Sequence, residues 1–350
     1  MSSRMSPKER ALRTIKRQEI DRLPIQMDFS GVGLDKVAKA WGLPSGGREI
    51  ITALDNHIVY AYLDDAFGNI KARKLGSDEV SYDAWCVGWN NYQEGPLAVV
   101  HPLADLDGWS GYEFPDPWAP GLLERAQKTV AEFGRDYLVT SYQAYCLFER
   151  AWALRGLENF LMDLVLRRDF VETLLDKITD YQVAIAKRYV QAGVACGRTG
   201  DDYGGKTSML FAPELWRDLI KPRLRRIWNV YKEAGVPVMH HTCGHVTPII
   251  GDFADMGLDI LNPVQPDAMD IRALKDQYGE RLTFYGGIST AGALSRGTPQ
   301  EVRDEVYHTV AVLGRGGGYI IAPAQGITSE VPLENIDALR EASTVSAGMF

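Results

Sequence analysis

The sequence alternates short apolar segments with longer amphipathic segments, and this alternation limits the possible folds more than any other feature. The segments expected to form strands are residues 23–29, 137–142, 194–201, 236–241, 258–262, 282–286 and 318–322. The segments expected to form helices are residues 121–134, 157–166, 168–193, 212–234, 245–256, 271–279, 299–313 and 332–344. With one further strand expected in the region 75–120, about eight strands alternate with helices, which predicts an α/β fold of the (β/α)8 TIM-barrel type.

The region 75–120 differs from the rest because it is rich in Trp, Tyr, Pro, Gly and Asp. Its tryptophans are Trp85, Trp89, Trp109 and Trp118. We interpret the region as a strand pair and long loops inserted into a single barrel domain that spans residues 1–350. The aromatic side chains fit two interpretations, a small core packed under the loops or a wall for a planar ligand.

Composition narrows the classes of partner and the compartment. The formal net charge is −8 and there is no block of basic residues, so nucleic acid is not expected as a partner. No apolar run reaches the roughly 20 residues of a membrane helix, and the first residues lack the apolar segment of a secretion signal. The four scattered cysteines fit no disulfide framework, which indicates the reducing cytoplasm.

Polar side chains gather where the expected strands end. In a (β/α)8 barrel the loops that follow the strands form the active site, so these side chains are the candidates for function. The candidates are Asp28, Glu149, Asp201, Asp202, Tyr203, His241, Cys243, Asn262, Gln265, Tyr285 and Gln325.

Some of these candidates also have structural interpretations. The pair Asp201–Asp202 precedes a Gly turn and could cap the next loop. Glu149 could form an ion pair with its neighbour Arg150. Asn262 and Gln265 could satisfy backbone groups of their loop.

The strand 236–241 runs directly into His241-Thr242-Cys243-Gly244, which is the strongest metal-binding pattern in the chain. One residue between a His and a Cys at the end of a strand lets imidazole and thiolate point into the same space, and zinc accepts both ligands. A buried free cysteine is also a common apolar filler, so the pair alone leaves two interpretations open.

The order and spacing of several segments resemble the uroporphyrinogen decarboxylase superfamily. The segments are 148–152, 200–204, 241–244, 257–265, 282–288, 316–323 and 331–336. The resemblance extends from about residue 140 to the end of the chain, and more loosely through 6–10 and 105–118. It implies the (β/α)8 barrel that the alternation of elements also predicts.

Two branches of that superfamily can be compared with this sequence. The decarboxylases carry an Arg-rich segment near the N-terminus that binds the porphyrinogen carboxylates, and no such segment follows the strand 23–29. The methyltransferases exchange methyl groups with a corrinoid carrier protein. Those that methylate coenzyme M hold zinc through His-x-Cys, which His241 and Cys243 match, and through a later Cys, whose place is taken by Gln325.

An amide is a poor zinc ligand, so the resemblance leaves the third ligand open. Asp202, Glu149 and His240 are the candidates to complete a mixed site, and a weak or absent metal is the alternative. A site with more nitrogen and oxygen ligands is a stronger Lewis acid, which favours an ether over a thiol as the methylated partner.

We therefore expect a corrinoid-dependent methyltransferase of the O-demethylation type. It would move a methyl group, with zinc, between a small methoxylated or methylated substrate and a corrinoid carrier protein. The corrinoid is expected from the partner, because the segment 55–57 only begins like a corrinoid loop and Tyr60 replaces the Gly of that loop. The family also suggests a homodimer, whereas the sequence leaves the methyl donor, the acceptor and the direction of transfer open.

The expected roles follow from the same resemblance. His241 and Cys243 would bind the metal, and Asp202 or Glu149 would complete the site or act as a general acid. The residues expected to shape the substrate pocket are Asp28, Tyr203, Asn262, Gln265, Tyr285 and Gln325. Two alternatives remain, decarboxylation of uroporphyrinogen and a non-catalytic barrel that binds a small molecule, the second of which Gln325 favours.

Overall fold

The chain closes into a ring of parallel strands, as the alternation predicts. The computed structural model describes residues 5–64, 73–75, 78–90, 92 and 94–348. The members of the ring are the segment 23–29, β1 (Ile58–Ala61), β6 (Leu138–Ser141), β7 (Gly197–Gly200), β8 (Val238–His241), β9 (Ile260–Val264), β10 (Thr283–Ile288) and β11 (Tyr319–Pro323). Every pairing between neighbours in this ring is parallel.

The segment 23–29 closes the ring between its first and last regular strands. The N–H of Gln26 donates to the carbonyl of Ile321 in β11 at 2.9 Å. On the other side, the N–H of His57 donates to the carbonyl of Ile25 at 3.1 Å, directly before β1. Parallel bridges join β6 to β7, so the fold is the expected (β/α)8 barrel.

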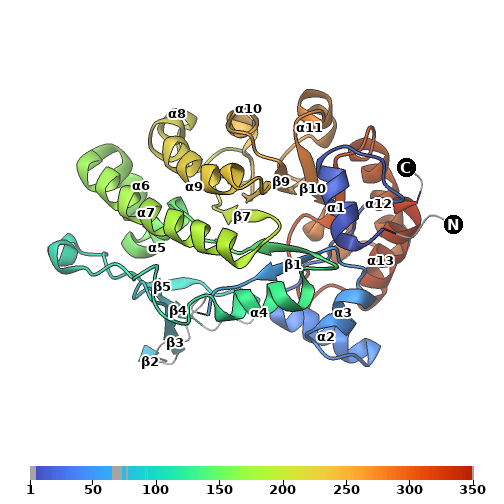
Figure 1. Ribbon diagram of the computed structural model, residues 1–350, viewed down its shortest axis with the longest axis horizontal. Helices are drawn as coiled ribbons and strands as arrows, with labels where there is room; N and C mark the ends of the chain where they lie inside the picture. Colours follow the sequence, from blue (N-terminus) through green and yellow to red (C-terminus); the bar gives the residue numbers. More distant parts are fainter. Residues whose placement is uncertain (1–4, 65–72, 76–77, 91, 93, 349–350) are drawn as a thin grey trace.

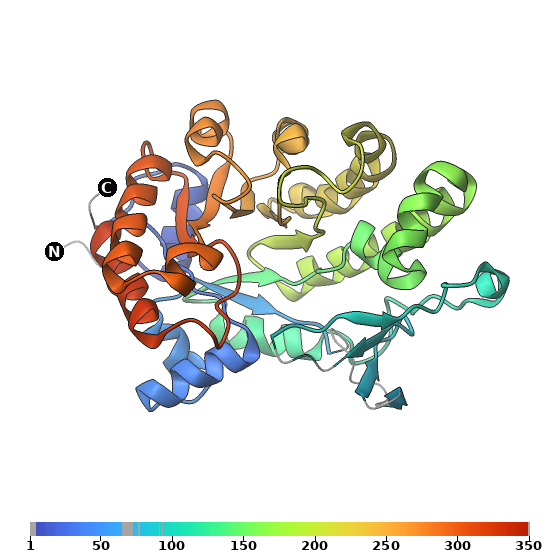
Figure 2. The same ribbon diagram turned by 180° about the vertical axis from the view of Figure 1, so that it is seen from behind.

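Helices pack around the ring and across one of its ends (Figures 1 and 2). They are α1 (Pro7–Ile15), α2 (Gly31–Trp41), α3 (Arg48–Ala53), α4 (Glu124–Phe133), α5 (Phe148–Arg155), α6 (Leu157–Leu166), α7 (Arg168–Ala192), α8 (Pro213–Leu215), α9 (Lys221–Glu233), α10 (Thr247–Met256), α11 (Ile271–Tyr278), α12 (Pro299–Leu313) and α13 (Leu333–Ala347). None of these described helices has the length and apolarity needed to cross a lipid bilayer.

Helix α1 fills the amino-terminal end of the barrel. Ser6 caps it by accepting the N–H of Glu9 at 3.1 Å. Ala11 and Ile15, on its buried face, belong to one apolar cluster with Leu138 and other strand residues. The side chains that could bind a metal lie at the opposite end, where the strands run into their loops.

Some sequence-based expectations about the elements are wrong in detail. The eighth strand is β1, which precedes the region 75–120 and is too short to show a clear apolar pattern. Helices α2, α3 and α5 were not expected. The break that Pro222 predicts in the helix 212–234 is present: a π-helical turn, η2 (Trp216–Ile220), lies just before Pro222, whose ring and missing N–H prevent a regular helix there.

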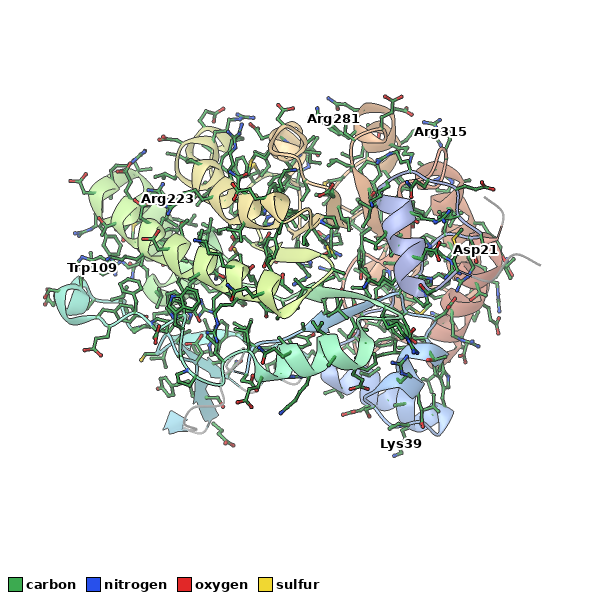
Figure 3. All side chains as sticks on the ribbon, in the orientation of Figure 1. Asp21, Lys39, Trp109, Arg223, Arg281 and Arg315 are labelled. Carbon is green, nitrogen blue, oxygen red and sulfur yellow. The ribbon has the colours of Figure 1, made fainter. Side chains whose placement is uncertain are left out.

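The inserted region forms a larger sheet than the expected strand pair. The strands β2 (Arg73–Leu75), β3 (Asp78–Tyr82), β4 (Gly88–Asn90) and β5 (Ala98–Val100) pair antiparallel, and the 3-10 helix η1 (Leu106–Gly111) follows. Trp85 and Trp89 are buried, which confirms the packed interpretation for these two side chains. Trp109 lies at the far tip of the insertion (Figure 3), and Trp118 is 56% exposed.

A buried ion pair attaches the insertion to the barrel. Arg150 Nη1 in α5 lies 2.6 Å from Asp83 Oδ2, and both side chains are at least nine-tenths buried. The indole N–H of Trp89 donates to the same carboxylate at 3.1 Å. Arg150 therefore pairs with Asp83 and not with its neighbour Glu149, whose carboxyl group remains available at the barrel mouth.

The base of the barrel predicts a pH-dependent stability. His57 is buried there with its Nε2 2.8 Å from Arg10 Nη1, and burial lowers the pKa of His57 from 6.5 to about 4. The unfolded chain binds a proton at His57 between these two pH values and the folded chain does not, so stability falls as the pH falls from about 6.5 to 4, by roughly 3 kcal/mol. Urea unfolding at a series of pH values measures this loss.

The variants His57→Gln and His308→Gln test the assignment. His308 is exposed on α12, so its replacement should leave the acid loss unchanged, whereas His57→Gln should flatten it. An equally steep loss in His57→Gln would contradict the role given to this imidazole.

Candidate functional site

Three potential metal ligands meet where β7 and β8 run into their loops. His241 Nε2 lies 3.5 Å from Cys243 Sγ and 3.7 Å from Asp202 Oδ1. The ligand atoms of these three residues all lie within 4.8 Å of one another. The His-x-Cys pair therefore converges as the sequence pattern predicts, and the loop after β7 adds a carboxylate.

These distances fit a single zinc ion. Bonds of about 2.0 to 2.3 Å in tetrahedral geometry place neighbouring ligand atoms about 3.3 to 3.8 Å apart. The separations of 3.5 Å and 3.7 Å from His241 Nε2 lie in this interval. A nitrogen, a thiol sulfur and a carboxylate oxygen are all accepted zinc ligands, and a fourth position would remain for a substrate atom.

Two glycines allow the loops after β7 and β8 to touch. A Cβ on Gly204 would lie 2.5 Å from the backbone N of His245, and a Cβ on Gly244 would lie 2.3 Å from the carbonyl O of Gly204. Gly244 also has a φ of 82°, which favours glycine. The contact is fixed by the N–H of His245, which donates to the carbonyl of Gly205 at 2.7 Å.

Because the two loops touch, Asp202 lies next to Cys243. The backbone N–H of Cys243 donates to Asp202 Oδ1 at 2.8 Å, so the carboxylate orients the loop as well as facing the thiol. Gln265 Oε1 accepts the N–H of Gly244 and holds the loop from β9. Gln265 is buried and lines neither of the cavities described below, so it satisfies loop backbone, which was its alternative interpretation.

Asn262 sets the tautomer of His241. Its Oδ1 accepts from His241 Nδ1 at 2.6 Å, which leaves the lone pair of Nε2 free to face Cys243 and Asp202. Metal-binding histidines usually donate their second ring nitrogen to a carbonyl or carboxylate in this way.

The charges of the cluster are unfavourable without a cation. Burial, and then the charges of Asp202 and Glu149, raise the pKa of the Cys243 thiol well above its usual value. Burial, and then Asp202 and Asp201, raise the pKa of Glu149. Burial and Arg198 lower the pKa of His241. A divalent cation would reverse the penalty on the thiolate and the carboxylate.

The two neighbouring aspartates have different roles. Asp201 is fully buried, and its carboxylate accepts the backbone N–H of Leu147 at 2.8 Å and of Glu149 at 2.9 Å. It therefore fixes the start of α5 and aims Glu149 at the mouth. Asp202 is partly exposed and faces His241, so the structural interpretation applies to Asp201, and Asp202 stays a candidate for function.

Two cavities adjoin this cluster, and four residues belong to the walls of both. The shared residues are Phe29, Tyr142, Arg198 and His241. The first cavity holds about 410 Å³, and its wall includes Asp28, Tyr60, Asn262, Tyr285 and Gln325. The second holds about 460 Å³, and its wall includes Glu94, Tyr145, Glu149 and Asp202.

Asp28 is held in the wall of the first cavity by several donors. The hydroxyls of Tyr60, at 2.8 Å, and of Tyr285 donate to Oδ2, and the amide of Gln26 donates to Oδ1 at 2.9 Å. The expected pocket residues Asp28, Tyr285 and Asn262 therefore lie on one wall together with Gln325, whose side chain is exposed.

Two sequence-based expectations are wrong. Tyr203 lines neither cavity, because its side chain is fully buried outside the ring, 5.9 Å from the ring of Trp216, and its hydroxyl donates to Asp201. His240, a candidate third ligand, points away from the site into the same aromatic core, where its Nδ1 lies 2.9 Å from Thr199 Oγ1. Successive strand residues point to opposite faces, so His240 and His241 cannot share a site.

Sequence reasoning did not select several residues of the cavity walls, among them Tyr60, Tyr142 and Arg198. Tyr60 lies in β1, which was not expected, and Tyr142 ends the expected strand 137–142 but belongs to no recognisable motif. Arg198 was missed although a signal existed, since a charged residue in the middle of an otherwise buried parallel strand is rare without a reason.

Comparison with known proteins adds a family and a fold. Residues 98–344 match the family model described as uroporphyrinogen decarboxylase. The methylcobamide:CoM methyltransferase MtaA of Methanosarcina barkeri is 29% identical over 186 residues, which are 53% of this chain and 52% of the relative. This alignment therefore spans about half the length of that relative.

Two further matches cover nearly the whole chain. The methylcobamide:CoM methyltransferase MtbA of Methanosarcina acetivorans is 24% identical over 357 residues, which are 96% of this chain and 97% of the relative. A solved methyltransferase from Methanosarcina mazei superposes with a TM-score of 0.72 at 21% identity, covering 97% of this chain and 99% of that one. The superposition supports the barrel fold.

The raised pKa of Cys243 predicts slow alkylation of the metal-free chain. Thiolates are the reactive form, so iodoacetamide at neutral pH should label the exposed Cys86 before Cys243. Asp202→Asn removes a negative charge beside the thiol and should accelerate labelling of Cys243 by about tenfold for each unit of lowered pKa. Peptide mass spectrometry measures both rates.

The variant Asp276→Asn, on the exposed side of α11, is the matched control and should leave the rate unchanged. If Asp202→Asn leaves the labelling rate of Cys243 unchanged, the carboxylate of Asp202 does not influence the thiol.

Proposed function

The chain belongs to the uroporphyrinogen decarboxylase family, and we propose that it is a corrinoid-dependent methyltransferase. It moves a methyl group between a small methoxylated or methylated substrate and the corrinoid of a separate carrier protein. The observation that carries the proposal is the convergence of His241, Cys243 and Asp202 beside two cavities. The names of the relatives, methylcobamide:CoM methyltransferases, support the same class of reaction.

The ligands proposed for zinc are His241 Nε2, Cys243 Sγ and Asp202 Oδ1. Bound zinc supplies a Lewis acid that polarises the heteroatom carrying the methyl group. Asp202 takes the third ligand position that Gln325 leaves open. Asn262 keeps the imidazole in the tautomer that the metal needs.

Glu149 is the proposed general acid. Burial, and then the charges of Asp202 and Asp201, raise the pKa of its carboxyl group and so favour the protonated form, and its side chain lines the same cavity as His241 and Asp202. In demethylation the bond between the methyl carbon and the substrate oxygen breaks, and the methyl group passes to the reduced corrinoid. The departing oxygen takes the proton from Glu149, and the same proton returns to Glu149 in the reverse direction.

The cavity walls do not favour the decarboxylation of uroporphyrinogen. Such a substrate carries eight carboxylates, and carboxylates are usually bound by arginines. Among the described residues that line the two cavities, Arg198 is the one permanently charged cation. One guanidinium suits a substrate with a single acidic group much better.

Metal analysis coupled to an activity assay tests the proposal. After zinc reconstitution, the chain should hold about one zinc and should transfer methyl groups from a methoxylated aromatic substrate to cob(I)alamin. Cys243→Ser and His241→Gln should lose zinc and lower the rate by more than the roughly 10- to 100-fold that loss of a residue hydrogen-bonded to a metal ligand usually costs.

Cys86→Ser is the matched control, because Cys86 is exposed and outside the cluster, and it should keep both zinc and activity. A zinc-free chain, or equal activity in Cys243→Ser, would contradict the proposal.

The role of Glu149 predicts a dependence on the leaving group. Glu149→Gln should slow demethylation of methoxybenzene by about 10²- to 10⁴-fold, because the departing phenolate needs a proton. The loss should be much smaller for 4-methoxynitrobenzene, whose phenolate leaves without one. Steady-state rates with both ethers measure the difference.

Glu124→Gln, in the exposed first turn of α4, serves as the control and should not affect either rate. Equal losses with both ethers in Glu149→Gln would show that this carboxyl group does not deliver the proton.

A further inference from the structure

Arg198 is the least satisfied buried cation in the described part of the chain. Four arginines there are buried, and three of them have a carboxylate partner. Arg10 pairs with Asp21 at 2.6 Å, Arg150 with Asp83 at 2.6 Å and Arg155 with Asp163 at 2.7 Å. Arg198 is 7% exposed, pairs with no described carboxylate, and has no partner for its Nε and Nη1.

Aromatic rings hold the guanidinium without satisfying its donors. Its carbon lies 4.5 Å from the ring centre of Tyr142 and 5.3 Å from that of Tyr60. Such stacking orients a guanidinium and leaves its N–H groups in the plane unused. Asp28 is the acidic residue in the wall of the first cavity, but its oxygens already accept hydrogen bonds from Tyr60, Tyr285 and Gln26.

A buried guanidinium without an ionic partner carries a large desolvation penalty, and proteins keep such groups where a ligand compensates them. Arg198 lines both cavities, and His241 lines both as well. A ligand in either cavity therefore reaches the cation at one point and the potential metal ligand at another. The tyrosines 60, 62, 142 and 285 give the first cavity flat aromatic walls.

We propose that Arg198 binds an oxyanion group of the methylated substrate and so selects small organic acids. A carboxylate or sulfonate would lie against the guanidinium, with the methyl-bearing heteroatom at His241, Cys243 and Asp202. This inference deepens the proposed function, because it names the substrate class of the same site. The binding itself does not depend on methyl transfer and can be measured separately.

Calorimetric titration of the zinc-reconstituted chain with matched ligand pairs tests the inference. The acids are 4-methoxybenzoate, methoxyacetate and 2-mercaptoethanesulfonate, and their neutral counterparts are 4-methoxybenzyl alcohol, 2-methoxyethanol and 2-mercaptoethanol. At least one acid should bind about 10- to 100-fold more tightly than its counterpart, the usual contribution of a hydrogen bond to a charged group. Whether the carboxylates or the sulfonate bind more tightly than their neutral counterparts distinguishes a carboxylate substrate from a sulfonate substrate.

Two substitutions assign the preference to this side chain. Arg198→Met should abolish the preference for the acid while neutral ligands bind as before, and Arg198→Lys should keep part of it, because an ammonium retains the charge without the planar fork. Arg198→Met should also raise the melting temperature, since it removes an unpaired buried charge, whereas loss of a merely structural arginine would lower it. Arg125→Met is the control, because exposed Arg125 stacks on the wall residue Tyr62.

The outcomes separate this inference from the proposed function. Acid binding that needs Arg198, in a chain without methyl transfer to cob(I)alamin, would support the inference and count against the methyltransferase. Methyl transfer with equal use of acids and neutral ligands would support the methyltransferase and overturn the inference. Failure of every acid to bind, or a preference that survives Arg198→Met, would also overturn it.

Discussion

The candidate site depends on the contact between the loops that follow β7 and β8. These loops can touch because Gly204 and Gly244 have no side chains, and a Cβ at either position would collide with backbone atoms. The contact brings Asp202 from one loop within reach of Cys243 from the other, where the carboxylate accepts a backbone N–H. Without this approach His241 and Cys243 would be a two-ligand pair, too few for a stable zinc site.

Burial disfavours the charged forms of the ionisable side chains in the same region. The thiol of Cys243 and the carboxyl group of Glu149 have raised pKa values, and Arg198 lies nearby without a partner for two of its donors. Other parts of the barrel offset this cost to the stability of the fold. Apolar residues of α1 pack against the strands at the base, and the buried Asp83–Arg150 pair attaches the insertion. Unsatisfied charge concentrated at one end of a well-packed barrel is typical of a site built for a ligand.

The sequence predicted the barrel and the His-x-Cys pair because both depend on local patterns. Strands such as 282–286 and 318–322 are apolar and bounded by glycines, and the spacing of His241 and Cys243 is a local property. The sequence offered three candidates for the third metal ligand, and only the positions of their side chains in the fold could distinguish them. Strand alternation turns His240 into the aromatic core, and the loop contact selects Asp202.

Other features depended on contacts that a sequence does not display. Strand β1 has four residues and no clear period, so Tyr60 could not be placed in the pocket. Tyr203 belongs to a strand-end motif, yet its side chain is buried outside the barrel, where its ring packs against Phe148 of α5 and Trp216 of η2. Arg150 forms its ion pair with Asp83 of the insertion, 67 residues away in the sequence, and not with Glu149. The carboxyl group of Glu149 therefore faces the second cavity.

X-ray absorption at the zinc edge of the reconstituted chain identifies the atoms bound to the metal. A zinc site made by His241, Cys243 and Asp202 should show one sulfur neighbour at about 2.3 Å and nitrogen or oxygen neighbours at about 2.0 to 2.2 Å. Asp202→Asn should change the nitrogen and oxygen shell while the single sulfur remains. A spectrum with two sulfur neighbours, or one that Asp202→Asn leaves unchanged, would contradict a zinc site made by His241, Cys243 and Asp202.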